Sequence, residues 1–217
     1  MGQKMDLENK ENLEMIIFDL DATLWDTIDV TVDASNEILK RKKLDIRVNY
    51  EIVKKGMGHN LKEVSKMYMP DLEEEKRMSL KEEMDNLTHE KILKNGAKLY
   101  PDVRLVLENL KEKFKLAIVS NCGDGHIESF IKYYHFENIF DDYIPASKYG
   151  ISKAEAIKEV MNRNNVKNAI FIGDTEKDYE ASKEAEIIFI YAKYGFGEID
   201  NNHVFSISAL KELLENI

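Results

Sequence analysis

Apolar residues in this chain form short, uninterrupted runs that are rich in β-branched and aromatic side chains. Such runs are typical of strands that are buried on both faces of a sheet. The pattern predicts four strands and one weaker strand, at Met15–Leu20, Leu116–Val119, Ala169–Ile172, Ile187–Tyr191 and Tyr143–Ile144.

Between these runs, apolar residues recur every three or four positions, which is the spacing of a helix with one buried face. Stretches of this kind begin near Val103, Ile127, Ala154 and Ala209. Strands that alternate with helices indicate βαβ units. We therefore expect an α/β fold with a mostly parallel sheet.

One long stretch departs from this alternation. From about Trp25 to Lys98 we find no convincing strand, and helices are predicted at Ile28–Leu39, Asn60–Met69 and Leu72–Leu93. The pattern divides the chain into a core domain, residues 1–24 and 97–217, and a helical domain, residues 25–96. Both sizes lie within the usual range for domains.

Composition excludes several classes of protein. A formal net charge of -10 argues against a general nucleic-acid binder, because such proteins neutralise phosphates with Lys and Arg. No apolar run approaches the ~20 residues of a membrane span, and residues 1–14 lack the apolar segment of a signal peptide. Cys122 is the only cysteine, which rules out an internal disulfide and suits a reducing compartment. We predict a cytoplasmic protein with no nucleic-acid or membrane partner.

Two carboxylates follow the first predicted strand. Asp19 and Asp21 are two positions apart, so in an extended chain they point to the same side. They would lie at the carboxyl end of a central strand, where ligands bind in open α/β sheets. Two buried carboxylates repel each other, so that one takes a proton or a cation joins them. The simpler alternative is a solvated turn in which Asp21 caps the next helix.

Other strands also end in polar residues. Ser120 and Asn121 end the second strand, and Asp174 ends the third, with Asp178 four positions further on. Taken singly, Asp174 is compatible with a helix N-cap and Asp178 with a favourable charge at a helix start. Together these residues converge on one edge of the sheet. Clustered carboxylates suit Mg²⁺, which prefers oxygen ligands.

A phosphate site also needs a positive charge. Lys153 is the candidate, because it lies in the loop before a predicted helix and near the same edge of the sheet. Lys148 is a weaker rival, and the ordinary alternative for either is a surface lysine.

These residues resemble the signatures of the haloacid dehalogenase superfamily. The first is Phe18-Asp19-Leu20-Asp21-Ala22-Thr23-Leu24, the second Val119-Ser120-Asn121, the third Lys153, and the fourth Gly173-Asp174-Thr175-Glu176-Lys177-Asp178. They occur in the family's order, and Tyr194-Gly195-Phe196-Gly197 is similar to the phosphoglycolate-phosphatase-like branch. The resemblance implies a Rossmann-like three-layer sandwich with a small helical cap. Ala22 stands where the family usually has glycine, and we expect it in an ordinary backbone region because alanine takes a positive φ only at a cost.

The resemblance also implies roles in a Mg²⁺-dependent phosphatase acting on a small phosphorylated metabolite. Asp19 would attack phosphorus, and Asp21 would serve as general acid and base. The implied metal ligands are Asp19, the backbone carbonyl of Asp21, and Asp174, with Asp178 supporting them. Phosphate would be bound by Ser120, Asn121, Lys153 and Thr23, and Thr23 would also brace the loop that carries the nucleophile.

Specificity is expected to come from the cap segment Lys55-Gly56-Met57-Gly58-His59. Its glycines permit close approach, and Lys55 and His59 are able to meet an anionic group. The alternative is a turn that only connects two helices.

Three other functions compete with a phosphatase. A signalling receiver domain also clusters Asp and Lys around Mg²⁺, but the order of Lys153 and Asp174 and the helical insert argue against it. A β-phosphoglucomutase shares all four signatures and returns the phosphoryl group to a hexose phosphate. A non-catalytic binding module is disfavoured by the complete set of carboxylates. The sequence determines neither the substrate nor the oligomeric state.

Overall fold

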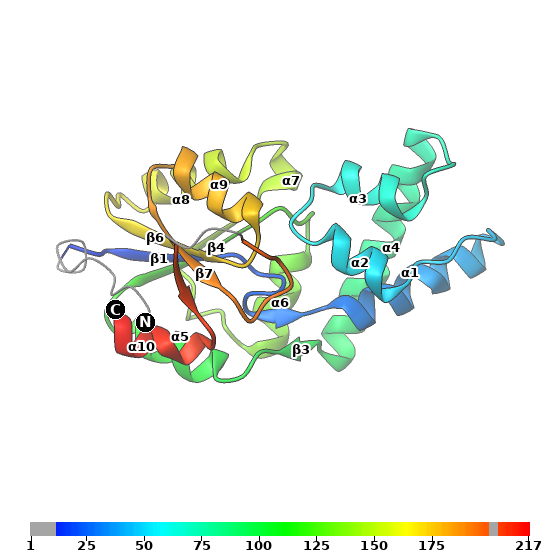
Figure 1. The fold of residues 1–217 in the computed structure, drawn as a ribbon. Coiled ribbons are helices and arrows are strands. Elements are labelled where there is room, and N and C mark those ends of the chain that lie inside the picture. The colour runs from blue at the N-terminus through cyan, green and yellow to red at the C-terminus, as the bar shows by residue number, and fades with distance from the viewer. Residues whose placement is uncertain (1–11, 200–203) are drawn as a thin grey trace.

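The computed structural model describes residues 12–199 and 204–217. It has two parts, a parallel sheet between layers of helices and a separate group of helices beside it (Figure 1). Most of the polar first segment, on which the prediction of no signal peptide rests, lies outside the described residues. In the part of the chain that is described, no helix is both long and apolar enough to cross a membrane.

The sheet has six parallel strands in the order β5-β4-β1-β6-β7-β8, which confirms the predicted α/β class. Strand β1 lies near the centre, and Ile17 pairs with Ala117 on one side and with Phe171 on the other. The five predicted strands are present, whereas β8 was not predicted. The bounds are β1 (Met15–Phe18), β4 (Lys115–Ser120), β5 (Asp142–Pro145), β6 (Ala169–Gly173), β7 (Ile188–Ala192) and β8 (Phe205–Ile207).

Successive side chains of β1 enter opposite layers, as the pleat of a strand requires. Met15 and Ile17 pack with the buried residues of α8 and α9, while Ile16 and Phe18 pack with those of α5 and α6. Figure 1 shows the sheet between these two layers, which is the expected three-layer sandwich. The helices are α5 (Val103–Lys111), α6 (His126–Tyr134), α7 (Ala146–Tyr149), α8 (Lys153–Arg163), α9 (Glu176–Glu184) and α10 (Leu213–Asn216).

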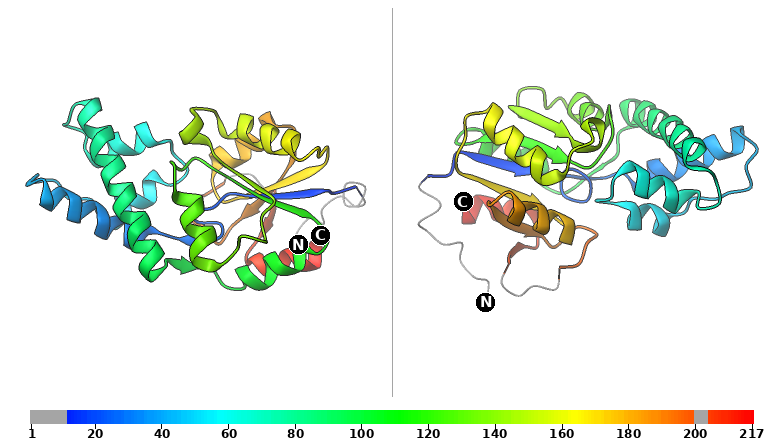
Figure 2. Two further views of the ribbon diagram at one scale, coloured as in Figure 1. Left: turned by 180° about the vertical axis from the view of Figure 1, so that it is seen from behind. Right: turned by 90° about the horizontal axis from the view of Figure 1, so that it is seen from above.

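The cap consists of α1 (Ile28–Arg41), α2 (Tyr50–Gly56), α3 (Leu61–Tyr68) and α4 (Glu74–Asn95). It has its own apolar core, to which Leu39, Val64 and Met84 contribute. The three predicted helices are present, and α2 is an addition. Both views in Figure 2 show α4 running along the side of the cap to the edge of the sheet.

A two-stranded antiparallel ribbon, β2 (Trp25–Asp26) with β3 (Lys98–Leu99), joins the cap to the core. The expectation of no strand in this stretch was therefore wrong at its two ends. Two-residue strands are too short to show a pattern of alternating side chains in the sequence. They form here because the segments that enter and leave the cap lie side by side. The exact domain boundaries stay a prediction.

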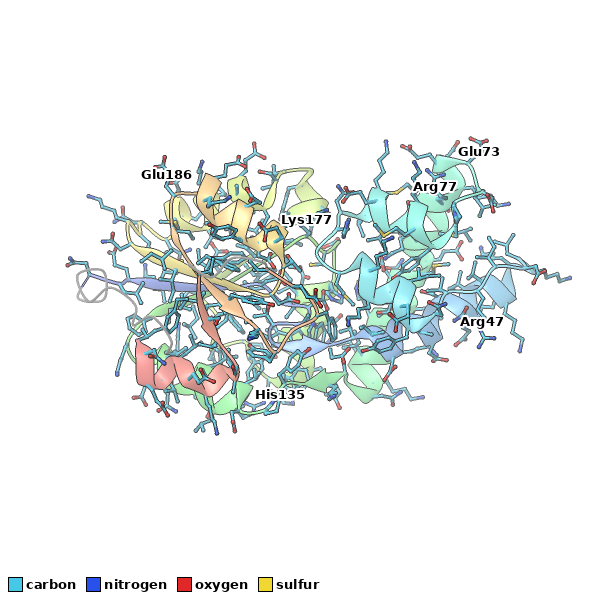
Figure 3. The ribbon with its side chains drawn as sticks, in the orientation of Figure 1. Arg47, Glu73, Arg77, His135, Lys177 and Glu186 are labelled. Atoms are coloured by element: carbon cyan, nitrogen blue, oxygen red, sulfur yellow. The ribbon has the colours of Figure 1, made fainter. Side chains whose placement is uncertain are left out.

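Polar contacts bridge the cap and the core beyond the ribbon. On the side of α9 that faces the cap, Lys177 forms an ion pair of 3.1 Å with Glu63 of α3 (Figure 3). Between α4 and α6, a Cβ placed on Gly125 would lie 3.0 Å from Nδ1 of His89, so α4 packs closely on the start of α6.

Candidate active site

A buried acidic cluster occupies the carboxyl edge of the sheet. Asp19 follows β1, Asp174 follows β6, and Asp178 lies in the first turn of α9. One oxygen of each carboxylate lies within 4.8 Å of the others. Asp178 is fixed by a capping box, in which its Oδ2 accepts from the Thr175 backbone N–H (3.0 Å) and from the Thr175 hydroxyl (2.7 Å).

Lys153 is the cation inside this cluster. Its Nζ donates to Asp19 Oδ1 (2.8 Å) and to Asp178 Oδ1 (2.5 Å). Ser152 caps α8 and so holds Lys153 at the first position of that helix. Burial alone would lower the pKa of Lys153, but the carboxylates of Asp178 and Asp19 raise it overall. The lysine is therefore charged and is not an ordinary surface residue.

Asp174 has one oxygen that the cluster leaves without a partner. Its Oδ2 accepts from the backbone N–H groups of Phe196 (2.8 Å) and Gly197 (3.0 Å), whereas the buried Oδ1 has no hydrogen-bond partner among the described residues. Burial and the neighbouring Asp178 raise the pKa of Asp174 to about 7. Burial also raises the pKa of Asp19 well above its usual range, against the pull of Lys153. An oxygen without a partner beside two crowded carboxylates fits a hard divalent cation such as Mg²⁺.

Asp21 faces a different environment. It accepts from the Thr27 hydroxyl (2.9 Å), and His126 Nε2 lies 3.0 and 2.9 Å from its two oxygens. Burial alone would raise the pKa of Asp21, but His126 and Thr27 bring it below its usual value. In turn Asp21 raises the pKa of His126, although burial opposes this. The two shifts together favour an ionised Asp21 beside a protonated His126.

The loop between the two aspartates is a tight turn. Ala22 has a φ of 63°, so the expectation of an ordinary backbone region was wrong. The turn returns at once into the ribbon, because the Ala22 backbone N–H donates to the Trp25 carbonyl (2.8 Å). A left-handed alanine costs roughly 1–2 kcal/mol, which these tertiary contacts offset.

Thr23 lies behind this loop. Its carbonyl accepts from the Tyr194 hydroxyl (2.8 Å), its side chain is buried, and Oγ1 has no partner among the described residues. It is absent from the described residues that line the pocket, so its predicted contact with phosphate and its bracing role both stay predictions.

The two polar residues that end β4 reach the pocket. Ser120 is buried, and its Oγ accepts from the Cys122 backbone N–H (3.4 Å). The Asn121 side chain instead donates to the Gly58 carbonyl of the cap (2.9 Å). In the structure Asn121 therefore links the core to the cap loop.

Only part of the predicted cap segment lines the pocket. Gly56, Met57, Gly58 and His59 line the pocket, whereas Lys55 is exposed and does not. Gly58 has a φ of 73°, and a Cβ there would lie 3.2 Å from the Thr175 side chain. The segment is thus also a connecting turn between α2 and α3, one that docks on the core.

Several pocket residues were not found from the sequence. His126 is separated from Asp21 by 105 positions, yet it starts the helix that follows β4, and such helix starts face the same sheet edge. Lys81, Asp85 and His89 recur every four positions along α4, so they share one face. That spacing was visible, but α4 is charged throughout and nothing marked this face as the one that lines the pocket.

Comparisons with known proteins identify the family of this chain. Residues 16–192 match the family of haloacid dehalogenase-like hydrolases, and the chain belongs to that family. The chain is 27% identical to a phosphoglycolate phosphatase of Aquifex aeolicus, over 87% of this chain and 89% of the relative. It is 25% identical to one of Vibrio parahaemolyticus, over 95% and 96%.

A solved structure shows the same fold. A predicted phosphoglycolate phosphatase from Haemophilus somnus superposes with a TM-score of 0.80 at 20% identity, covering 94% of this chain and 97% of that one. The sequence relatives support a phosphatase, and this structural likeness adds the fold.

Proposed function

We propose that the chain is a Mg²⁺-dependent phosphatase that hydrolyses a small phosphorylated metabolite through an aspartyl-phosphate. Phosphoglycolate is the reference substrate, because the sequence relatives bear that name. One observation carries the proposal: two carboxylates two residues apart have opposite surroundings. Asp19 lies in the acidic cluster beside Lys153, and Asp21 is bonded to His126. Asp19 thus lies beside a fixed positive charge, which suits an anionic nucleophile, and Asp21 lies beside a group that can supply a proton, which suits a general acid.

Mg²⁺ would be held by the carboxylates of Asp19 and Asp174 and by the backbone carbonyl of Asp21. When bound, it favours ionised carboxylates and draws charge from the phosphoryl oxygens. Asp178 supports this site without serving as a ligand, because its two oxygens are already bonded to Lys153 and Thr175.

In the first step, a carboxylate oxygen of Asp19 bonds to phosphorus, and the bond from phosphorus to the substrate's alcohol oxygen breaks. The leaving oxygen takes, through Asp21, the one proton that Asp21 and His126 share, which leaves Asp21 as a carboxylate beside a neutral His126. Ser120, the Asn121 backbone and Lys153 bind the other phosphoryl oxygens. Thr23 braces the loop that aligns Asp19.

In the second step, Asp21 accepts a proton from a water molecule, whose oxygen bonds to phosphorus. The bond from phosphorus to Asp19 breaks, which releases phosphate and restores the Asp19 carboxylate, while the Asp21–His126 pair has regained its proton. We call the residues that act on phosphorus the phosphate end: Asp19 and Ser120, which line the pocket, and the buried Lys153, Asp174 and Asp178 beside Asp19. The residues beside the departing alcohol form the leaving-group end: Asp21, Lys81, Asp85, His89 and His126.

The setting that we propose is the cytoplasm, because the only cysteine, Cys122, is free. A small phosphorylated metabolite is the partner, with the cap segment Gly56–His59 as a contributor to its selection.

The test is phosphate release from a panel of phosphorylated metabolites with Mg²⁺, for the wild type and for Asp19→Asn. We expect the variant to lose at least about 10³-fold in kcat/KM, the scale of losing covalent catalysis. Equal release by both proteins would refute the mechanism. The matched control is Asp26→Asn, which removes a carboxylate from the ribbon.

The same panel of substrates distinguishes a phosphatase from a mutase. Glucose 1-phosphate with the chain should yield free phosphate and glucose. Accumulation of glucose 6-phosphate without phosphate release would instead establish phosphoryl transfer to a hexose phosphate.

A further inference from the structure

The leaving-group end contains several charged residues, and each is already matched by a neighbour. Lys81 and Asp85 form a hydrogen-bonded ion pair across one turn of α4. The Lys81 side chain is buried and that of Asp85 is one-quarter exposed, so the carboxylate is the more accessible partner. The ammonium group also lies 5.8 Å from the centre of the Tyr68 ring.

The two histidines at this end do not add free positive charge. His126 is paired with Asp21 at 2.9 Å. The ring of His89 lies 5.5 Å from that of His126, and burial together with the charge of His126 lowers the pKa of His89 to about 4. His89 is therefore neutral at pH 7, with one ring nitrogen able to donate and one to accept.

The remaining histidine of the pocket belongs to the opposite side. His59 sits in the cap loop whose neighbour Gly58 contacts Asn121 and Thr175, beside the phosphate end. Lys55, which was expected to meet an anion, is exposed outside the pocket. Among the described residues that line the leaving-group end, no cation is left without a compensating carboxylate.

This balance matters because a carboxylate of phosphoglycolate would have to give up its hydration here. Attraction to Lys81 would be largely cancelled by repulsion from Asp85, so the loss of hydration would stay uncompensated. Hydroxyl groups fit better, since each can donate to Asp85 and accept from Lys81 or His89. Matching of donors and acceptors strongly discriminates between substrates, because unmatched buried groups are costly.

We infer that the preferred substrate is a phosphate monoester of an uncharged polyhydroxy alcohol, such as a glycerol phosphate or a sugar phosphate, and that the Lys81–Asp85 pair disfavours leaving groups that carry a carboxylate. This inference rests on the proposed phosphatase function and narrows its substrate.

The experiment compares kcat/KM for glycerol 3-phosphate and hexose 6-phosphates with kcat/KM for phosphoglycolate, all with Mg²⁺. We expect the best polyol phosphate to exceed phosphoglycolate at least about tenfold in the wild type. In Asp85→Asn, Lys81 loses its partner and attracts the carboxylate, so this ratio should fall at least about tenfold. Glu82→Gln is the matched control, because it removes the same charge from the exposed face of α4 and should leave the ratio unchanged.

Each outcome separates the two proposals. A wild type that prefers phosphoglycolate while Asp19→Asn is inactive overturns the substrate inference and leaves the phosphatase intact. An unchanged ratio in a folded Asp85→Asn variant also overturns it. Absence of Asp19-dependent phosphate release from every substrate overturns both. The wild-type ratio needs no variant, so the inference stays testable even if Asp85→Asn does not fold.

Discussion

The two ends of the pocket use the same kinds of side chain but are built differently. At the phosphate end, every residue comes from the core and lies at the end of a strand, just after one, or in the first turn of a helix. Lys153 joins carboxylates from two segments. At the leaving-group end, Asp21 and His126 meet residues from a single cap helix, α4. One end is therefore fixed by the sheet, whereas the other is assembled from two parts. The edge of the sheet positions the residues proposed to act on phosphorus. A separately packed cap can vary the groups that contact the rest of the substrate.

The largest effect should come from removing the shared cation of the phosphate end. Lys153→Met leaves Asp19 and Asp178 buried without their partner, and breaking such a buried pair costs about 3–5 kcal/mol. Urea unfolding should show this loss, and Mg²⁺ should recover part of it. Lys148→Met is the control, because its ion pair with Asp124 is exposed and its loss should cost under about 1 kcal/mol. Similar losses in both variants would contradict the assigned role.

Metal addition should stabilise the phosphate end specifically. At a Mg²⁺ concentration about 100 times Kd, the wild type should gain about 2.7 kcal/mol in the free energy of unfolding. Asp174→Asn should lose this gain, because the oxygen without a partner belongs to Asp174. In EDTA at pH 7, Asp174→Asn should be no less stable than the wild type. Burial and the neighbouring Asp178 already disfavour a negative charge on Asp174, so its removal costs little. Thermal unfolding with and without EDTA measures both expectations.

At the leaving-group end, His126→Gln should affect catalysis more than folding. Without the imidazole, the pair no longer stores a proton, and kcat should fall about 10- to 100-fold. The pKa of Asp21 should rise, because a neutral amide stabilises its charge less than imidazolium. The acidic limb of the pH–kcat profile should therefore move to higher pH. An unchanged limb with reduced kcat would indicate a purely structural role.

Protonation of His89, at the leaving-group end, should make the free energy of unfolding depend on pH. Its pKa is about 4 in the folded chain and about 6.5 when unfolded, so between these values the unfolded state binds more protons. Stability is therefore lost as pH falls, by up to about 2 kcal/mol between pH 7 and pH 5. His89→Gln should remove that part of the loss in urea unfolding at both pH values. His135→Gln should not, because His135 is exposed on the underside of the core (Figure 3).

The smallest effect should come from Ala22→Gly in the loop that joins the two ends. Glycine relieves the left-handed strain, but it also gives the unfolded chain more freedom and loses a buried methyl group. We expect a change of less than about 1 kcal/mol in the free energy of unfolding, towards greater stability. A loss above that value, measured by urea unfolding, would show that the methyl group packs usefully in the turn.

The difference between the two ends also explains what the sequence could predict. Asp19, Asp174 and Lys153 were found because strand ends and helix starts are local signals, and parallel strands bring them to one edge. Ala22 was mispredicted because its conformation is decided by contacts with Trp25 and the close approach of Gly195, not by its own preference. Lys81 and Asp85 were missed because they resemble their exposed neighbours on α4 in every local respect. Only the packing of the cap distinguishes them.

The ribbon of β2 and β3 has one further consequence. The chain leaves the core at Asp26 and re-enters it at Lys98, at two adjacent points of a paired ribbon. Any insert whose ends meet at this spacing can be spliced in without shifting the register of the sheet. Under the proposed roles, the ribbon joins the core residues that carry out the reaction to the cap residues that contact the leaving group, so exchanging the cap would change the substrate and keep the reaction. A graft between these two residues would keep Asp19 and Lys153 in place and replace the whole of α4.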